Sequence, residues 1–423
     1  MKKKCKDSTT YLMTGKMNNS TLNQLLATLS LIIDYQGGEQ LYHAWRVAIV
    51  AKYVCDEISP AESQWLFYAG LLHDVGITGI ESHPARYPEL EESHLSYWLR
   101  YHPVIGANIV EKIPGLSRVA PWIRDHHEWI NGKGFPAHKR EQSIHVNSQI
   151  LRVADDYDLR FRTRAGLTRS DMYEYFRSHV GTEFSPHMWD VLRRLNSKDM
   201  GLFFFEVNDE SRLPYKLKEI MHDLPAIDGT VSEDVSIDVI LRVFGIVIDA
   251  RHHYTAGHSE RVREYSMILS KRLGIKGHEL KSIARAAYLH DLGKIATPLS
   301  ILNKAGPLNK SEWKTMRRHT IYTMELIDAV EALWELGPLA GYSQERYDGT
   351  GYPDGLKGSA IPMGARIIAV ADAIDAIKTR RSYKRALSWR VVVRELKKSS
   401  GSMYDPEIID HAIDYITEEK LAL

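Results

Sequence analysis

Cysteine is scarce in this chain, with only Cys5 and Cys55 among 423 residues. Two cysteines offer no disulfide framework, which argues against a small secreted scaffold. The formal net charge is only +1, so no overall field attracts a nucleic-acid polymer or a membrane surface. The most apolar runs, residues 25–33 and 239–248, are too short to cross a bilayer. We therefore expect a cytoplasmic protein whose partners include neither a membrane nor a nucleic-acid polymer.

A signal peptide is also missing, because the basic start of the chain is not followed by an apolar stretch. We expect residues 1–19 to form a flexible N-terminal tail. The remaining length is too great for one ordinary core and suits two domains. Hydrophobic residues at 44% and charged residues at 26% are typical of a globular protein. Histidine, by contrast, is plentiful, with 19 residues.

The sequence contains an internal repeat. Residues 125–136 read DHHEWINGKGFP and residues 342–353 read YSQERYDGTGYP, so that a glutamate, two glycines and a proline recur 217 positions apart. The same interval joins three further matches: His73-Asp74 with His290-Asp291, His102 with His319, and Asp155 with Asp372. We therefore predict a first domain over residues 20–197, a linker over 198–231 and a second domain over 232–423.

Within each repeat the apolar residues are spaced as in helices. Segments such as AWRVAIVAKYV and SIARAAYLH have apolar residues three and four positions apart, and alternating strand patterns are scarce. We predict an all-α fold of two tandem helical bundles, each with a polar cluster in its core. The linker contains the run FFF (203–205), which we expect to form a small strand or an apolar plug.

The first repeat contains eight side chains that suit metal binding. They are Glu39, His43, His73, Asp74, His102, His126, His127 and Asp155. Glu39 and His43 lie four positions apart, so on a helix they share one face and can reach the same ion. In an adjacent His-Asp pair the imidazole can bind one ion while the carboxylate bridges two. A lone histidine is more often structural, but eight candidate ligands in one repeat, four of which (His73, Asp74, His102 and Asp155) recur 217 positions later, favour a metal centre.

The mixture of imidazole and carboxylate suits Fe, Mn, Zn or Ni rather than Ca or Mg. Two such ions about 3.5–4 Å apart activate a bridging hydroxide and neutralise a phosphate in an in-line displacement. The sequence therefore predicts phosphoester hydrolysis in the first repeat, with the bridging hydroxide held at Asp74.

At these residues the chain resembles the HD superfamily, and specifically the HD-GYP cyclic-dinucleotide phosphodiesterases. The second repeat has the family strings LHDLGKIATPLSILNKAGPLN and ERYDGTGYPDG, and the first is a diverged copy with GFP at 134–136. The tandem arrangement is similar to that of bacterial phosphodiesterases that hydrolyse 3'3'-cGAMP, whereas the family more commonly acts on c-di-GMP. The resemblance implies two HD-type bundles. We expect two or three divalent ions, Fe or Mn in preference to Ni or Zn.

The metal ligands of the family map unevenly onto the two repeats. All eight have a counterpart in the first repeat, whereas the second repeat retains five, namely His258, His290, Asp291, His319 and Asp372. Tyr254 stands in place of the glutamate, and Ser343 and Gln344 replace the paired histidines. One ion could still bind in the second repeat, but the other position would have too few ligands. The resemblance therefore places hydrolysis in the first domain and gives the second a regulatory or supporting role.

Three further expectations follow from the resemblance. The family's lysine after the HD pair, which helps to hold the scissile phosphate, is Lys294 in the second repeat but Ile77 in the first. Of the RSYK element (381–384) the first repeat retains only Arg164, which we expect to bind substrate. Asp158 corresponds to the family's second aspartate near the nucleophilic water, and it would act as a proton acceptor or an orienting group.

We therefore predict a metal-dependent phosphodiesterase that converts a cyclic dinucleotide, 3'3'-cGAMP ahead of c-di-GMP, to a linear 5'-phosphorylated dinucleotide. Asp74 and Asp158 are the expected catalytic residues. One alternative is a non-catalytic cyclic-dinucleotide sensor, which Ile77 favours. Another is an HD phosphohydrolase of other nucleotides, against which the GYP-type string argues. A homodimer is the default assembly.

Overall fold

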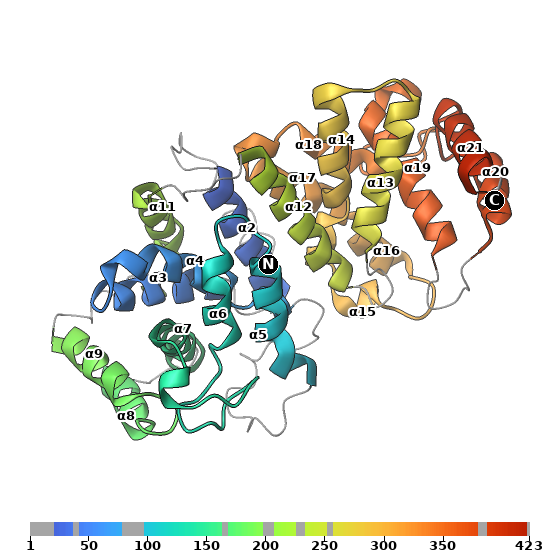
Figure 1. Ribbon diagram of the computed structural model, residues 1–423. Helices are drawn as coiled ribbons and strands as arrows, with labels where there is room; N and C mark the ends of the chain where they lie inside the picture. Colours follow the sequence, from blue (N-terminus) through green and yellow to red (C-terminus); the bar gives the residue numbers. More distant parts are fainter. Residues whose placement is uncertain are drawn as a thin grey trace. The chain divides into compact units, whose positions relative to one another are not determined.

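The computed structural model describes residues 21–36, 42–77, 97–162, 168–197, 207–225, 233–251, 257–379 and 387–420. These residues are mostly helical (Figure 1), and among them there is no β-strand, only isolated bridges such as Asn131–Arg140. The prediction of an all-α fold is confirmed. The FFF run of the linker lies outside the described residues.

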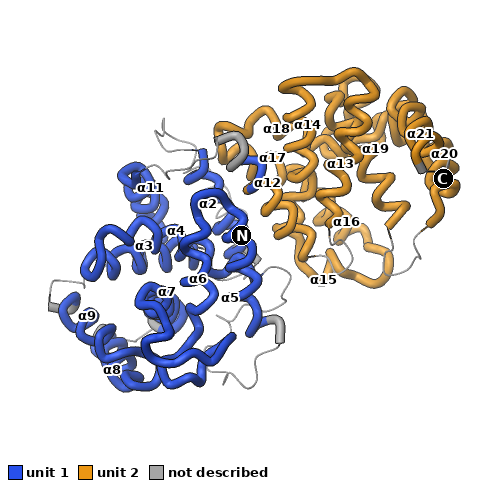
Figure 2. The backbone as a smooth tube through the Cα atoms, in the orientation of Figure 1, with its two compact units in different colours: residues 1–239 blue, residues 240–423 orange. Residues whose placement is uncertain are grey.

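The chain divides into two compact units, unit 1 (Met1–Val239) and unit 2 (Ile240–Leu423), coloured separately in Figure 2. The division falls inside helix α12 (Glu233–Ala250). Nothing in this division tests the narrower limits expected for the two domains and their linker, which stay predictions.

Unit 1 consists of a bundle of α-helices joined by short helical turns. The helices are α2 (Thr21–Gln36), α3 (His43–Asp56), α4 (Ser63–Leu72), α5 (Tyr97–Val110), α6 (Ala120–Arg124), α7 (Val146–Asp156), α8 (Arg169–Ser178), α9 (Pro186–Ser197) and α11 (Leu213–Asp223). The turns are the 3₁₀ segments η1 (Pro60–Glu62), η2 (Val75–Ile77), η5 (Ser117–Val119) and η6 (Glu141–Ser143), and the π-helical η7 (Tyr157–Arg162).

Unit 2 repeats this plan. Its helices are α12, α13 (His258–Arg272), α14 (Gly277–Leu289), α15 (Leu299–Leu302), α16 (Lys310–Arg317), α17 (His319–Asp328), α18 (Leu336–Gly341), α19 (Met363–Lys378), α20 (Trp389–Ser399) and α21 (Pro406–Lys420). Its 3₁₀ turns are η8 (Leu292–Ala296), η9 (Glu331–Leu333), η10 (Tyr342–Gln344) and η11 (Gly358–Ala360). No helix in the described part of the chain is both long enough and apolar enough to span a membrane.

Helix α3 lies at the centre of unit 1, where it packs against α4 and α7 (Figure 1). Apolar residues occur around most of its circumference, as expected of a helix that is covered on several sides. The crossing with α4 is very close, since a Cβ added at Gly70 would lie 2.4 Å from the Cα of Ala48. In unit 2, α13 packs in the same way against α14 and α19.

The helix before each central helix caps it through an aspartate. Asp34 of α2 accepts the backbone N–H of Ala44 at 3.2 and 3.1 Å, and Asp249 of α12 accepts that of Ser259 at 3.3 and 3.1 Å. A carboxylate is favourable there because the first N–H groups of a helix have no partner within it. The caps fix the starts of α3 and α13, whose first residues are His43 and His258.

Candidate metal centre

Five helices of unit 1 bring histidines and carboxylates to one buried place. His43 begins α3, His73 and Asp74 follow α4, His102 lies in α5, His126 and His127 follow α6, and Asp155 lies in the last turn of α7. Each of these seven residues is at most 7% exposed. Seven of the eight predicted ligands therefore lie in one cluster, whereas Glu39 lies outside the described residues.

Asp74 stands between two sets of histidines. Its Oδ1 lies 3.2 Å from Nε2 of His102, while its Oδ2 lies 3.3 Å from Nε2 of His73 and 3.6 Å from Nε2 of His43. A carboxylate with one oxygen toward each set is arranged as a bridging ligand would be.

The potential ligand atoms form overlapping groups. Atoms within 4.8 Å of one another are offered by His43, His73 and Asp155, by His73, Asp74 and His126, and by His102, His126 and His127. In the group of His43, His73 and Asp155, Nε2 of His43 lies 3.3 Å from Nε2 of His73 and 3.4 Å from Oδ1 of Asp155. More than one ion could be held, because the groups share members without coinciding.

Backbone carbonyls orient three of the histidine rings. In each, Nδ1 meets the carbonyl oxygen three positions earlier: His73 that of Gly70 at 2.8 Å, His102 that of Leu99 at 2.5 Å, and His126 that of Ile123 at 2.6 Å. A carbonyl only accepts, so Nδ1 donates, and in the neutral form of each ring Nε2 has the lone pair. Nε2 of His126 is buried with no hydrogen-bond partner. A metal ion would satisfy that atom, so this part of the donor set fits a divalent transition metal.

Burial and charge shift the titration of the cluster. Burial raises the pKa of Asp74, but the charge of His73 and hydrogen bonds from His102 and other histidines hold that pKa well below its usual range. Burial also lowers the pKa of His126 well below its usual value, and the neighbouring His73 and His102 lower it further. Asp74 is therefore ionised and His126 neutral, the forms that bind metals. Burial lowers the pKa of His43 and His73, but Asp158 beside His43 and Asp74 beside His73 raise both above their usual value.

Asp158 lies behind the cluster and is fully buried. Its Oδ2 accepts from Nδ1 of His43 at 2.7 Å and from Nη2 of Arg46 at 3.2 Å, and its Oδ1 accepts from Nε of Arg46. Burial raises the pKa of Asp158, but Arg46 and His43 together hold it far below its usual value. Both oxygens of Asp158 are therefore engaged, Oδ2 with His43 and Arg46 and Oδ1 with Arg46. This geometry supports the orienting role rather than that of a proton acceptor.

His127 is held differently from the other histidines. Its Nδ1 lies 2.8 Å from Nη1 of Arg152, which also donates from Nε to Asp156 at 2.9 Å and from Nη2 to Glu183 at 2.8 Å. Arginine has only donors, so Nδ1 of His127 must accept. Burial lowers the pKa of His127 well below its usual value, with His126 among the further causes, so the ring is neutral.

Unit 2 retains only part of this arrangement. His258, His290 and Asp372 offer ligand atoms within 4.8 Å of one another. Where unit 1 has His126, unit 2 has Ser343, whose hydroxyl is buried without a hydrogen-bond partner. Nζ of Lys294 lies 2.5 Å from Oδ2 of Asp291, so an ammonium group already occupies one face of this carboxylate.

Sequence reasoning missed the two arginines behind the unit 1 cluster. A signal for Arg46 was present, because HAWRV and HSERV both have arginine three positions after the histidine. Arg261 does bind Asp375 in unit 2, from Nε at 2.5 Å. Nothing comparable marked Arg152, whose counterpart in the repeat is Ala369. Arg164 lies outside the described residues.

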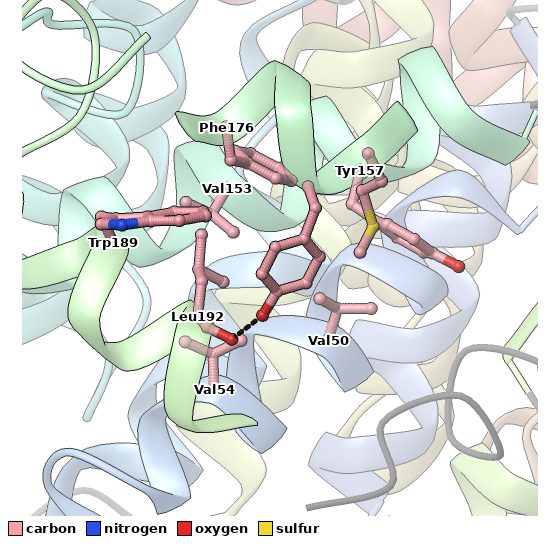
Figure 3. Close-up of a pocket in the computed structure, with 9 residues that line it drawn as sticks. Val50, Val54, Val153, Tyr157, Phe176, Trp189 and Leu192 are labelled. Atoms are coloured by element: carbon pink, nitrogen blue, oxygen red, sulfur yellow. Dashed lines mark hydrogen bonds between the residues drawn. The ribbon is translucent and has the colours of Figure 1, made fainter. Parts of the chain in front are cut away.

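A small apolar pocket lies beside α7 (Figure 3), and none of the clustered histidines lines it. Val50, Val54, Val153, Tyr157, Met172, Tyr173, Phe176, Trp189 and Leu192 line it, and only about 10 Å³ is free. Tyr173 donates a hydrogen bond across it to the carbonyl of Leu192, drawn dashed in Figure 3. Such a space is too small for a nucleotide, so it is a gap in the packing behind the metal-site helices.

Models of the HD domain match the chain twice, over residues 41–160 and over residues 243–408. The chain therefore belongs to the HD-domain family, with one such domain in each half. The resemblance seen in the repeated motifs is confirmed.

Curated relatives of the chain are bacterial phosphodiesterases. The 3'3'-cGAMP-specific phosphodiesterase 3 of Vibrio cholerae is 30% identical over 302 residues, which are 71% of this chain and 64% of the relative. The 3'3'-cGAMP-specific phosphodiesterase 1 of the same organism is 27% identical over 411 residues, 93% of this chain and 91% of the relative. A cyclic di-GMP phosphodiesterase of Thermotoga maritima is 36% identical over 183 residues, 43% of this chain and 50% of the relative. The chain thus spans less than two thirds of the first and third relatives.

One solved structure has the same fold over nearly the whole chain. It is described as cyclic GMP-AMP specific phosphodiesterases in V. cholerae (V-cGAP3), and the match has a TM-score of 0.61 at 22% identity. It covers 95% of this chain and 99% of that chain. At this level of identity the likeness confirms the tandem helical fold alone.

Proposed function

We propose that this protein is a metal-dependent phosphodiesterase that hydrolyses a cyclic dinucleotide, with 3'3'-cGAMP ahead of c-di-GMP, to a linear 5'-phosphorylated product. The observation that supports it best is the position of Asp74, with one oxygen toward His102 and the other toward His43 and His73. The substrate class is proposed from the relatives, whose printed names specify cyclic dinucleotides.

Hydrolysis takes place in unit 1 in this proposal. His43, His73 and Asp155 would hold one divalent ion and His102 and His126 another, with Asp74 between them. Bound ions, two or three in number and Fe or Mn ahead of Ni or Zn, supply the positive charge that activates water and stabilises the phosphate. Asp158 keeps Nε2 of His43 directed into the centre through its bond to Nδ1. Glu39 as a further ligand and Arg164 as a substrate-binding residue stay predictions.

Unit 2 would support or regulate the reaction rather than perform it. His258, His290 and Asp372 could hold a single ion. A second ion would lack the pair of histidines that unit 1 has, because Ser343 and Gln344 stand in their place. The ammonium of Lys294 also competes with a metal ion for the carboxylate of Asp291. A homodimer stays a further prediction.

A second candidate is a sensor that binds the cyclic dinucleotide without cleaving it. Ile77 favours this alternative, because it is a buried apolar side chain at the position where unit 2 has Lys294. The first unit therefore has no ammonium group there to hold a phosphate. Binding without turnover in the metal-loaded protein is the result that would select the sensor.

The decisive experiment compares two matched double variants, His73→Ala/Asp74→Ala in unit 1 and His290→Ala/Asp291→Ala in unit 2. Bound metal is measured by elemental analysis and turnover by chromatography of the linear product. We expect the unit 1 variant to lose its ions and all measurable hydrolysis, and the unit 2 variant to retain turnover within a few-fold. Loss of turnover only in the unit 2 variant would overturn the assignment of the catalytic unit.

A further inference from the structure

The two adjacent histidines of unit 1 have opposite hydrogen-bond patterns. Nδ1 of His126 donates to the carbonyl of Ile123 at 2.6 Å, whereas Nδ1 of His127 accepts from Nη1 of Arg152 at 2.8 Å. A neutral imidazole has one protonated nitrogen and one lone pair in the plane of its ring. Because Arg152 occupies the lone pair of His127, the proton of that ring is on Nε2. His127 offers a potential ligand atom within 4.8 Å of those of His102 and His126, but in this arrangement its Nε2 has a proton instead of the lone pair that a metal ion needs.

Arg152 is held firmly in this position. Arg152 is only 7% exposed. It donates to two buried carboxylates, Asp156 at 2.9 Å and Glu183 at 2.8 Å. Asp156 in turn accepts from Nε of Arg160 at 3.0 Å. Turning Arg152 away from His127 would break its ion pairs with two buried carboxylates, which is unfavourable.

The internal repeat connects this charged network with His127. In unit 2, 217 positions later, His127 is replaced by Gln344, Arg152 by Ala369 and Asp156 by Ala373. The alignment of GTEF (181–184) with GSMY (401–404) places Met403 at Glu183. The histidine and its entire charged support are therefore present together in unit 1 and absent together in unit 2.

His127 also differs from the other histidines in its surroundings. It is 7% exposed, whereas His43, His73 and His102 are fully buried. Its ring stacks on Phe135 with centroids 4.8 Å apart and an interplanar angle of 23°, which covers a face of the ring but not its edges. The Nε2–H group lies on the part of the ring that does not face Arg152.

We propose that His127 is a hydrogen-bond donor to the substrate rather than a metal ligand. Its Nε2–H binds a non-bridging oxygen of the phosphate, and Arg152 is the positioning residue that fixes this tautomer. The donor serves a unit whose position 77 is isoleucine and offers no side-chain hydrogen bond. The identity of the phosphate ester rests on the proposed function, but the tautomer and the metal count do not.

The first test is the number of ions bound by the full-length protein after reconstitution with Mn²⁺. We compare the native chain with His126→Ala, His127→Ala and His127→Gln by elemental analysis. His126→Ala is expected to bind about one ion fewer per chain, while both His127 variants retain the native number. If His127→Ala loses as much metal as His126→Ala does, His127 is a ligand and the proposal is wrong.

The second test uses inorganic phosphate as the probe, because its binding requires no hydrolysis. We expect His127→Ala to weaken phosphate binding to the Mn²⁺-loaded protein about tenfold or more, as measured by titration calorimetry. His127→Gln should restore much of the affinity, since its amide N–H can replace Nε2–H. Equal affinity in the native and His127→Ala proteins refutes the donor role. Failure of the native protein to cleave any cyclic dinucleotide would reject the proposed function but leave both tests in force.

The third test observes the tautomer directly. In the Zn²⁺-loaded protein with ¹⁵N-labelled histidine, the His127 signals are identified by their absence in His127→Gln. The native spectrum is expected to show a protonated Nε2 at His127, and Arg152→Met to move that proton to Nδ1. A protonated Nδ1 in the native protein contradicts the proposal, and this result does not depend on whether Arg152→Met folds.

Discussion

At the scale of single residues, the centre depends on groups that lie behind the potential metal ligands. Asp158 binds both Nδ1 of His43 and the side chain of Arg46, and it thereby fixes which nitrogen of His43 faces the other ligands. Asp375 holds His258 in the same way in unit 2, at 2.7 Å from Nδ1. Asp158 and Asp375 make the same contact to a histidine, but unit 2 has fewer potential metal ligands than unit 1. A substitution at one aspartate is therefore the control for the same substitution at the other.

The change Asp158→Asn should weaken metal binding in unit 1 about 10- to 100-fold, because the uncharged amide no longer matches the His43 N–H and the Arg46 guanidinium. The metal affinity is measured by competition with a chelator, and turnover should fall with it. Asp375→Asn makes the same change in unit 2 and should leave turnover within a few-fold of native. An equal loss of turnover in both variants would mean that the two units act together in catalysis.

Cys55 should be an inert thiol in the native protein. It is fully buried, and its Sγ lies 3.4 Å from the carbonyl of Ser59. Burial raises the pKa of this thiol to about 12, with Asp56 and Glu62 as further causes, so the reactive thiolate is almost absent at about pH 8. In a Cys5→Ser background, a thiol reagent should label nothing until the protein is unfolded. Rapid labelling of the native form would show that α3 opens readily.

At the scale of elements, close backbone approaches set the positions of the ligands. A Cβ added at Gly76 of η2 would lie 2.0 Å from the carbonyl oxygen of His102 and 2.6 Å from the backbone nitrogen of Gly106. Gly293 of η8 has the same relation to α17, since a Cβ added there would lie 1.9 Å from the carbonyl oxygen of His319. In both units the turn after the His-Asp pair can touch the next ligand helix only because a glycine stands there.

Gly76→Ala should therefore push α5 away from η2 and carry His102 out of the centre. We expect a loss of about 1–3 kcal/mol in the free energy of unfolding, from overpacking, together with reduced metal content and turnover. Chemical denaturation and elemental analysis provide the two measurements. Gly293→Ala is the matched control, with a similar loss of stability but native metal binding in unit 1. Unchanged metal content in a destabilised Gly76→Ala protein would show that His102 is dispensable.

Much of the arrangement could be predicted from the sequence, because helical spacing and the 217-residue interval are local or repeated signals. They predicted the all-α fold, the tandem repeat and a histidine cluster that includes His73 and His126, while the resemblance to a known family implied the two HD domains. Long-range polar pairs have no such signal. Glu183 meets Arg152 from 31 positions away, and no periodicity indicates that contact. The π-helical η7 after α7 was equally unpredictable, since the corresponding part of unit 2 lies in the regular helix α19.

At the scale of the whole molecule, the two units place different positive charges on the same scaffold. In unit 2, Lys294 and His290 hold the pKa of Asp291 well below its usual range, against the effect of burial. In unit 1 the corresponding Asp74 lies close to Nε2 of His43, His73 and His102, and position 77, where unit 2 has Lys294, is isoleucine. Unit 2 therefore has a lysine ammonium beside this carboxylate, whereas in unit 1 we expect bound metal to supply the corresponding positive charge.

Metal removal should consequently destabilise unit 1 and leave unit 2 almost unchanged. A ligand present at 100 times its dissociation constant stabilises the native state by about 2.7 kcal/mol. For a unit of this size that free energy corresponds to a fall in melting temperature of roughly 5–10 °C on chelation. Differential scanning calorimetry with and without chelator measures it, and His73→Ala/Asp74→Ala should show no such fall because it has lost the site. His290→Ala/Asp291→Ala should respond to the chelator as the native protein does. A fall of equal size in the unit 1 variant would place the stabilising ions elsewhere, because a centre without Asp74 has no carboxylate to join its two sets of histidines.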